Sequence, residues 1–228
     1  MPTEYEIRER LTIVQARLGA AAYKAGRDAS SIRLVLASKT QPSEAIRAAA
    51  NAGARDFGEN YVQEAIAKRA ELADLTEIRW HLIGHLQTNK ARTAAGAFAL
   101  IHSVDSVRLA EALARAQPSP RVRALIEVNL GGEASKTGAA PDGVAAILDA
   151  AREKIEIDGL MTIPPTGLGA EAARRYFAQL RELRDRLAMR SGIALSELSM
   201  GMTDDFEVAI EEGATIVRIG RAVFGERK

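Results

Sequence analysis

Eight short strand-like segments alternate with helical segments along this chain, and this alternation limits its possible folds more than any other feature. The predicted strands are residues 33–38, 56–58, 78–84, 99–102, 122–129, 156–161, 197–200 and 215–219. The predicted helices between them are residues 43–52, 61–73, 88–95, 106–116, 142–151, 170–191 and 204–212. Strict alternation of this kind predicts parallel strands joined by right-handed crossovers.

Eight such units in 228 residues predict an α/β fold, a single (β/α)8 TIM-type barrel. An open, doubly wound sheet is the alternative. The extra first segment carries Ile7, Leu11, Val14 and Leu18 at helical spacing, so we expect residues 1–30 to add an N-terminal helix that packs on the barrel. We find no linker or change in composition, and therefore predict one domain over residues 1–228.

The composition narrows the classes of protein and of site. The formal net charge is +1 with acids and bases interspersed, which does not favour a nucleic-acid surface. The chain has no cysteine, so disulfides and thiolate metal sites are excluded. The charged N-terminus lacks the apolar core of a signal peptide, and no apolar run reaches the ~18 residues that span a bilayer. We expect a cytoplasmic globular protein.

Lys39 follows the apolar run Leu34–Ala37 at the end of the first predicted strand. Only seven of the thirty-one basic residues are lysine, so a lysine here calls for an explanation. A partly desolvated lysine amine has a lowered pKa and can form a Schiff base with a carbonyl, which arginine cannot do. A surface lysine that merely closes the strand is the alternative.

Polar and small residues gather at the carboxyl ends of the predicted strands, the side of a barrel that carries the active site. The segment Ser199–Thr203 offers two hydroxyls and a glycine before the acidic residues Asp204 and Asp205, and Gly220 follows the last strand. Barrels often bind phosphate at the loops after their seventh and eighth strands. Alternatively, Ser199 and Thr203 simply cap the next helix.

Arg218 stands inside the apolar last strand and, if buried, needs an acceptor. The candidates are a carboxylate, Glu59 or Asp205, or else a heteroaromatic nitrogen or phosphate of a ligand. His81 alternates with apolar neighbours, which favours a hydrogen-bonded core residue over a ligand-binding one. The spacing of the three histidines fits no metal motif, so we predict no metal site.

Seven motifs then occur in order: ASKTQP, FGENYVQE, WHLIGHLQTNK, HSVDS, a loop with Val128, Asn129, Glu133, Lys136 and Gly138, GLMTI, and LSMGMTDDFEVAI with VRIG and FG. Together they resemble the pyridoxal phosphate homeostasis protein family, also called the YggS/PROSC family. The resemblance extends from Lys39 to Gly225. It implies a barrel similar to the N-terminal domain of alanine racemase, with pyridoxal 5′-phosphate (PLP) bound as a Schiff base on Lys39.

The resemblance also implies the other cofactor-binding residues. These are Ser199, Met200, Thr203 and Gly220 at the phosphate, Arg218 at the pyridine nitrogen, Asn60 beside the ring, and Met161. Thr203 stands where many relatives carry serine and keeps the hydroxyl. Lys90 and Lys136 also match family positions, which implies a role either as secondary aldehyde acceptors or as lysines of a transfer site.

The sequence therefore predicts a non-catalytic protein that holds and buffers PLP in vitamin B6 homeostasis and delivers it to apoenzymes. An arginine at the pyridine nitrogen weakens the cofactor as an electron sink. Alanine racemase also uses a tyrosine from its partner subunit's added domain, and none of the four tyrosines here is an evident substitute; they are Tyr5, Tyr23, Tyr61 and Tyr176. A small amino-acid racemase is the alternative, with a phosphorylated-sugar aldolase third. Without a sustained heptad, a monomer is expected.

Overall fold

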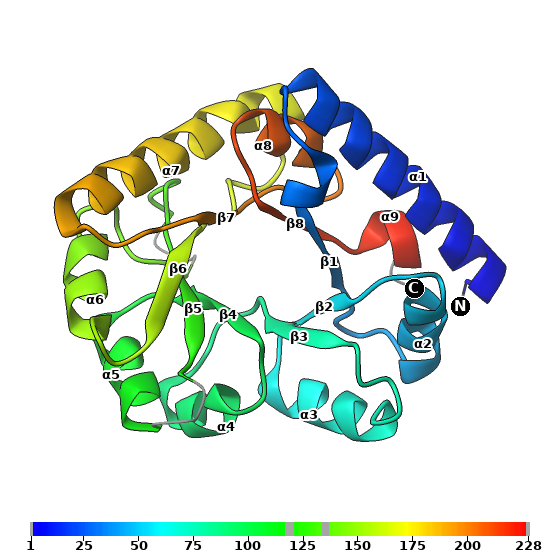
Figure 1. The fold of residues 1–228 in the computed structure, drawn as a ribbon, viewed down its shortest axis with the longest axis horizontal. Coiled ribbons are helices and arrows are strands. Elements are labelled where there is room, and N and C mark those ends of the chain that lie inside the picture. Colours follow the sequence, from blue (N-terminus) through cyan, green and yellow to red (C-terminus); the bar gives the residue numbers. More distant parts are fainter. Residues whose placement is uncertain (1, 117–120, 134–136, 227–228) are drawn as a thin grey trace.

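The computed structural model describes residues 2–116, 121–133 and 137–226, which form a closed barrel of eight parallel strands (Figure 1). Each strand pairs with the next one in the chain, and β8 pairs with β1. The strands are β1 Arg33–Ala37, β2 Asp56–Glu59, β3 Arg79–Leu82, β4 Leu100–Val104, β5 Arg123–Glu127, β6 Glu156–Met161, β7 Glu197–Ser199 and β8 Ile216–Ile219. The predicted barrel is confirmed, and the open sheet is excluded.

Helices surround the barrel on the outside (Figure 1). They are α1 Glu4–Lys24, α2 Ser43–Asn51, α3 Val62–Glu71, α4 Ala91–Ala95, α5 Val107–Ala116, α6 Val144–Ala151, α7 Ala170–Ser191, α8 Phe206–Glu211 and α9 Arg221–Phe224, with single 3₁₀ turns at Ala29–Ser31 and Thr88–Lys90. The helix predicted at 88–95 is thus divided between a 3₁₀ turn and α4. The four-residue α9 was not predicted.

Strand side chains alternate between the outer layer and the barrel interior, as a parallel barrel requires. In β8, Val217 and Ile219 belong to the large apolar core between the strands and the helices. Ile216, on the other face, joins a separate small cluster, completed by Val35, Leu100, Leu125 and Met161. The interior also holds buried polar side chains, among them His81, His102 and Arg218.

Helix α1 begins with a capping box, because the Thr3 hydroxyl accepts from the Glu6 N–H while the Glu6 side chain accepts from the Thr3 N–H. Its buried face carries the predicted apolar residues, from Ile7 to Leu18. This face packs against α2, α8 and α9, so α1 covers the seam where β8 meets β1 (Figure 1).

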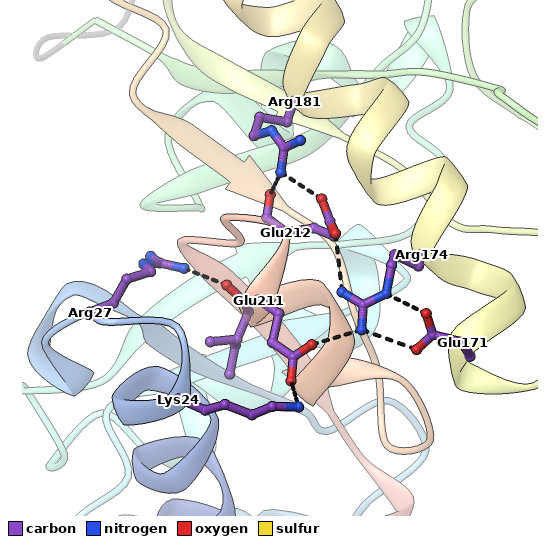
Figure 2. Close-up of polar contacts among 8 residues, drawn as sticks. Lys24, Arg27, Glu171, Arg174, Arg181, Glu211 and Glu212 are labelled. Atoms are coloured by element: carbon purple, nitrogen blue, oxygen red, sulfur yellow. Dashed lines mark hydrogen bonds and ion pairs between the residues drawn. The ribbon is translucent and has the colours of Figure 1, made fainter.

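Ion pairs add a polar connection between α1, α7 and α8 (Figure 2). Arg174 of α7 contacts Glu171, Glu211 and Glu212, at 2.6, 2.7 and 3.1 Å. Lys24 at the end of α1 also contacts Glu211, at 2.6 Å. The two glutamates at the end of α8 therefore bind both flanking helices. Among the described residues, no helix is long and apolar enough to cross a membrane.

Candidate functional site

Lys39 lies in the turn after β1, two residues beyond the end of the strand, and is half-buried. Because β1 is placed between β2 and β8, the turn neighbours Asn60 after β2 and Gly220 after β8. A Cβ on Gly220 would lie 3.1 Å from the carbonyl oxygen of Ala37, so a glycine lets these two strand ends approach closely. The structure thus brings Lys39, Asn60 and Gly220 to adjacent strand ends at the C-terminal side of the barrel.

A buried lysine on α3, Lys68, holds the backbone on one side of this turn. Its Nζ donates to the Ser38 carbonyl oxygen at 2.8 Å, to Glu59 Oε1 at 2.9 Å and to Glu64 Oε1 at 2.7 Å. An ammonium has three donors, so all three are used. Glu59 is fully buried, and burial raises its pKa. It pairs with Lys68, so it is not the partner proposed for Arg218.

The same side chains hold the other side of the turn. Thr40 has a positive φ of 65°, a left-handed conformation that a β-branched residue rarely adopts. Its N–H donates to Glu64 Oε1 at 2.7 Å, and the Ser38 hydroxyl donates to Glu59 Oε1 at 2.6 Å. Both neighbours of Lys39 are therefore fixed by one charged cluster, Glu59, Glu64 and Lys68, which we call the lysine clamp.

Arg218 projects into the barrel and is 4% exposed. It donates to the Ser199 hydroxyl at 2.6 Å and to the Thr162 carbonyl oxygen at 3.0 Å. Burial lowers the pKa of Arg218 to about 10, so the guanidinium stays charged at neutral pH. Within the part of the chain that the structure describes, no carboxylate forms an ion pair with it. The direct carboxylate partners considered, Glu59 and Asp205, are therefore wrong.

A series of buried side chains continues from Ser199 through the barrel interior. His102 Nδ1 lies 2.9 Å from the Ser199 hydroxyl, and His102 Nε2 lies 3.0 Å from His81 Nδ1. His81 Nε2 in turn lies 2.9 Å from Asp56 Oδ1. Burial lowers the pKa of both imidazoles, which favours their neutral forms. The prediction that His81 is a hydrogen-bonded core residue is confirmed.

The loop after β7 makes a sharp turn before α8. Gly201 has φ 91°, and a Cβ on it would lie 2.6 Å from the Ala209 side chain. The Met202 N–H donates to Asp205 Oδ1 at 2.6 Å, and α8 begins at Phe206. Thr203 therefore precedes the helix by three residues and does not cap it, contrary to the alternative considered from the sequence.

Three N–H groups of this loop have no acceptor among the described residues; they belong to Gly201, Thr203 and Asp204. The Met200 N–H is already used by the Ile216 carbonyl oxygen, at 3.1 Å. The Ser199 hydroxyl is likewise occupied inside the barrel. The predicted roles of Ser199 and Met200 at a phosphate stay predictions, and the unused donors lie one to five residues further on.

Two other predicted site residues lie at the same end of the barrel. Met161 ends β6, fully buried, and pairs in register with Ser199. Lys90 ends the 3₁₀ turn after β3 and is half-buried. Lys136 lies outside the described residues. Among the described residues, no group of three or more histidines or carboxylates could hold a metal ion.

Sequence reasoning missed Glu64, Lys68 and His102. One signal was present, because Glu64 and Lys68 are four residues apart on a predicted helix and lysine is rare in this chain. His102 lies two residues after Leu100 on β4. Its side chain is therefore on the same face of the strand, and that face points into the barrel. Its partners come from strands distant in the sequence, and no local pattern reveals them.

A family described as "Alanine racemase, N-terminal domain" matches residues 17–228. The pyridoxal phosphate homeostasis protein of Pseudomonas aeruginosa is 46% identical over 97% of this chain and 96% of its own length. The protein of the same name from Aquifex aeolicus is 48% identical over 96% of this chain and 98% of its own.

Solved structures give the same result. PipY of Synechococcus elongatus, determined with PLP bound, is 42% identical, with a TM-score of 0.85 over 96% of this chain and all of its own. Alanine racemase of Clostridium difficile shares the fold, with 14% identity and a TM-score of 0.70 over 97% of this chain and 57% of its own. With near-complete coverage on both sides, the chain belongs to the pyridoxal phosphate homeostasis protein family.

Proposed function

We propose that this protein holds PLP on Lys39 and serves as a non-catalytic reservoir of the cofactor in vitamin B6 homeostasis. The observation that carries the proposal is the position of Lys39, in a turn fixed on both sides and at the same barrel end as Gly220 and Arg218. The aldehyde of PLP condenses with a lysine amine and releases water, forming a carbon–nitrogen double bond. A relative of 42% identity solved with PLP bound supports the choice of ligand.

The other residues fit a phosphorylated pyridine. The unused N–H groups of Gly201, Thr203 and Asp204 are suited to phosphate oxygens. Gly220 lets backbone approach closely where a side chain would obstruct it. Arg218 would bind the ring nitrogen as a donor, and Asn60 and Met161 would flank the ring. Lys90 and Lys136 would be secondary acceptors of the aldehyde.

The absence of catalysis is part of the proposal. A charged donor at the pyridine nitrogen opposes protonation of that nitrogen and so weakens electron withdrawal by the cofactor. Racemisation also needs an acid or base opposite Lys39. Tyr61 lies just after Asn60, but this residue is 64% exposed and is therefore not enclosed in a site. We further propose a single-domain, cytoplasmic monomer that passes PLP to apoenzymes.

The test is the absorption spectrum of the protein after incubation with PLP and desalting. We expect a visible band in the wild type and in Lys154→Ala, a control lysine before β6 at the other end of the barrel. The band should be lost in Lys39→Ala. A band that persists in Lys39→Ala would refute Lys39 as the attachment point, and a missing band in the wild type would refute PLP binding.

Amino-acid turnover then separates a reservoir from a racemase. We expect the PLP-loaded protein to racemise alanine and other amino acids far below ~1 per second, the low end of ordinary enzyme rates. Turnover in the ordinary range, lost in Lys39→Ala, would instead establish the racemase.

A further inference from the structure

A hydrogen-bonded series crosses the barrel interior from one end toward the candidate site. It contains Asp56, His81, His102 and Ser199, and it ends on Arg218. We call these four residues the barrel relay. Each link is 2.6–3.0 Å long and buried. The proposed function assigns no role to Asp56, His81 or His102.

We infer that the barrel relay has one fixed direction of donation and positions Arg218 for the cofactor. Asp56 is the starting point because an ionised carboxylate only accepts hydrogen bonds. His81 must therefore donate from Nε2, and a neutral imidazole then accepts at Nδ1. His102 must donate from Nε2 to that atom and accept at its own Nδ1. Only the Ser199 hydroxyl can supply this last proton.

The direction of the relay determines what Ser199 offers to Arg218. Because the Ser199 hydroxyl donates its hydrogen bond to His102, its oxygen can only accept from Arg218. The guanidinium has no acceptor and donates this bond. Both imidazoles are pinned as neutral Nε2–H tautomers, because any other tautomer would place two donors or two acceptors face to face. As long as both rings are neutral, the carboxylate at one end and the guanidinium at the other fix every proton between them.

The relay also helps to hold a buried arginine that forms no ion pair with any carboxylate of the described residues. Glu127 and Asp205 favour its charged form from a distance. Asp56 adds negative charge at the far end of the relay, where Arg79 pairs with it at 2.6 Å and reaches solvent. Hydrogen bonds in series polarise one another, so Asp56 strengthens the acceptor that Arg218 contacts.

Arg218 is thereby fixed in place, and its remaining N–H groups, which have no acceptor among residues 2–116, 121–133 and 137–226, could serve a ligand. His81, His102 and Asp56 are positioning residues that touch no ligand themselves.

The first experiment is ¹⁵N NMR of the imidazoles in the PLP-free protein. The chain has three histidines, and the half-exposed His85 lies outside the relay, so its resonances serve as an internal reference. We expect His81 and His102 to be neutral Nε2–H tautomers from about pH 6 to about pH 8, the range in which an ordinary histidine changes its charge. An Nδ1–H tautomer or a doubly protonated ring at either position would overturn the inference.

The second experiment compares Asp56→Asn with Asp158→Asn. Asp158 is a matched control, because it is a buried carboxylate paired with a solvent-reaching arginine, Arg123 at 2.9 Å, but has no histidine contact. We expect Asp56→Asn to shift the His102 nitrogen resonances and to weaken PLP binding about threefold to thirtyfold. Asp158→Asn should change neither.

Unchanged His102 resonances or unchanged PLP affinity in Asp56→Asn would contradict the inference. The affinity arm rests on the proposed function, whereas the NMR arm does not. A wild-type protein that binds no PLP would therefore refute the proposed function, and the tautomers would still decide the relay.

Discussion

Lys39 is positioned by the residues on either side of it, which the lysine clamp holds. We therefore expect mutations in the lysine clamp to disturb the site. Its central residue, Lys68, gives all three of its donors to buried or half-buried oxygens. A surface lysine with fewer partners would tolerate replacement. Removal of Lys68, in contrast, leaves the buried Glu59 carboxylate without a cation beside it.

We expect Lys68→Met to lower the free energy of unfolding by about 3 kcal/mol, because breaking a buried ion pair leaves an uncompensated charge. The turn should also lose its fixed geometry, and capture of PLP by Lys39 should slow. Urea unfolding and the rise of the visible absorption band measure the two effects. Lys24→Met removes a mostly exposed lysine and is the control. Equal behaviour of both variants would show that the clamp does not hold the turn.

Part of the candidate site is visible in the sequence. An isolated lysine after an apolar run and an arginine within an apolar strand are local patterns, and both Lys39 and Arg218 could be found from them. The direction of the Ser199 side chain could not. It depends on where β4 and β8 place His102 and Arg218, and those contacts span 97 and 19 residues.

Among the secondary-structure elements, β6 and β7 come together at a glycine. A Cβ on Gly159 would lie 1.8 Å from the Glu197 carbonyl oxygen, far inside any allowed contact. Gly159 and Glu197 are also paired in the register of the two strands. Strand β7 therefore cannot move away from β6 without breaking the hydrogen bonds between them.

We expect Gly159→Ala to destabilise the protein by about 3 kcal/mol or more, since overpacking here pushes on backbone. Gly19→Ala is the contrasting control, because it lies in α1 and a Cβ added there would meet nothing within 4 Å. Alanine favours a helix, so this change should stabilise by about 0.5–1 kcal/mol. Thermal unfolding measures both, and a harmless Gly159→Ala would show that β6 and β7 can separate.

The positions of the strands could be predicted from the sequence more accurately than the ends of the helices. The eight strands could be located because each is a short segment with apolar residues that pack outward against the helices. Helix ends depend on capping contacts instead. The acidic residues after Thr203 predicted a helix that begins at residue 204. In the structure the Asp205 carboxylate accepts the Met202 N–H, and α8 begins at Phe206.

Across the whole molecule, the ion pairs in Figure 2 connect the first helix to elements more than 140 residues away. Arg174 contacts three glutamates at once, which raises its contribution above that of an isolated surface pair.

We expect Arg174→Met to lower the free energy of unfolding by about 1 kcal/mol at low salt and by less at 1 M salt, where the Debye length is ~3 Å. Arg115→Met removes an exposed arginine with a single partner, Glu111, and should have no measurable effect. Denaturant unfolding at both salt concentrations measures the difference. A salt-independent loss in Arg174→Met would assign the effect to packing of the side chain instead.

Closure of the barrel places the first strand beside the last, and this has a consequence for biosynthesis. Lys39 follows β1, whereas Arg218 lies on β8, so the two enter the ribosome's exit tunnel nearly 180 codons apart. Pairing of such distant segments is slow, and it cannot begin before β8 has been translated. The nascent chain therefore carries Lys39 long before it has Arg218, and under the proposed function the complete cofactor site would form only after translation of the last strand.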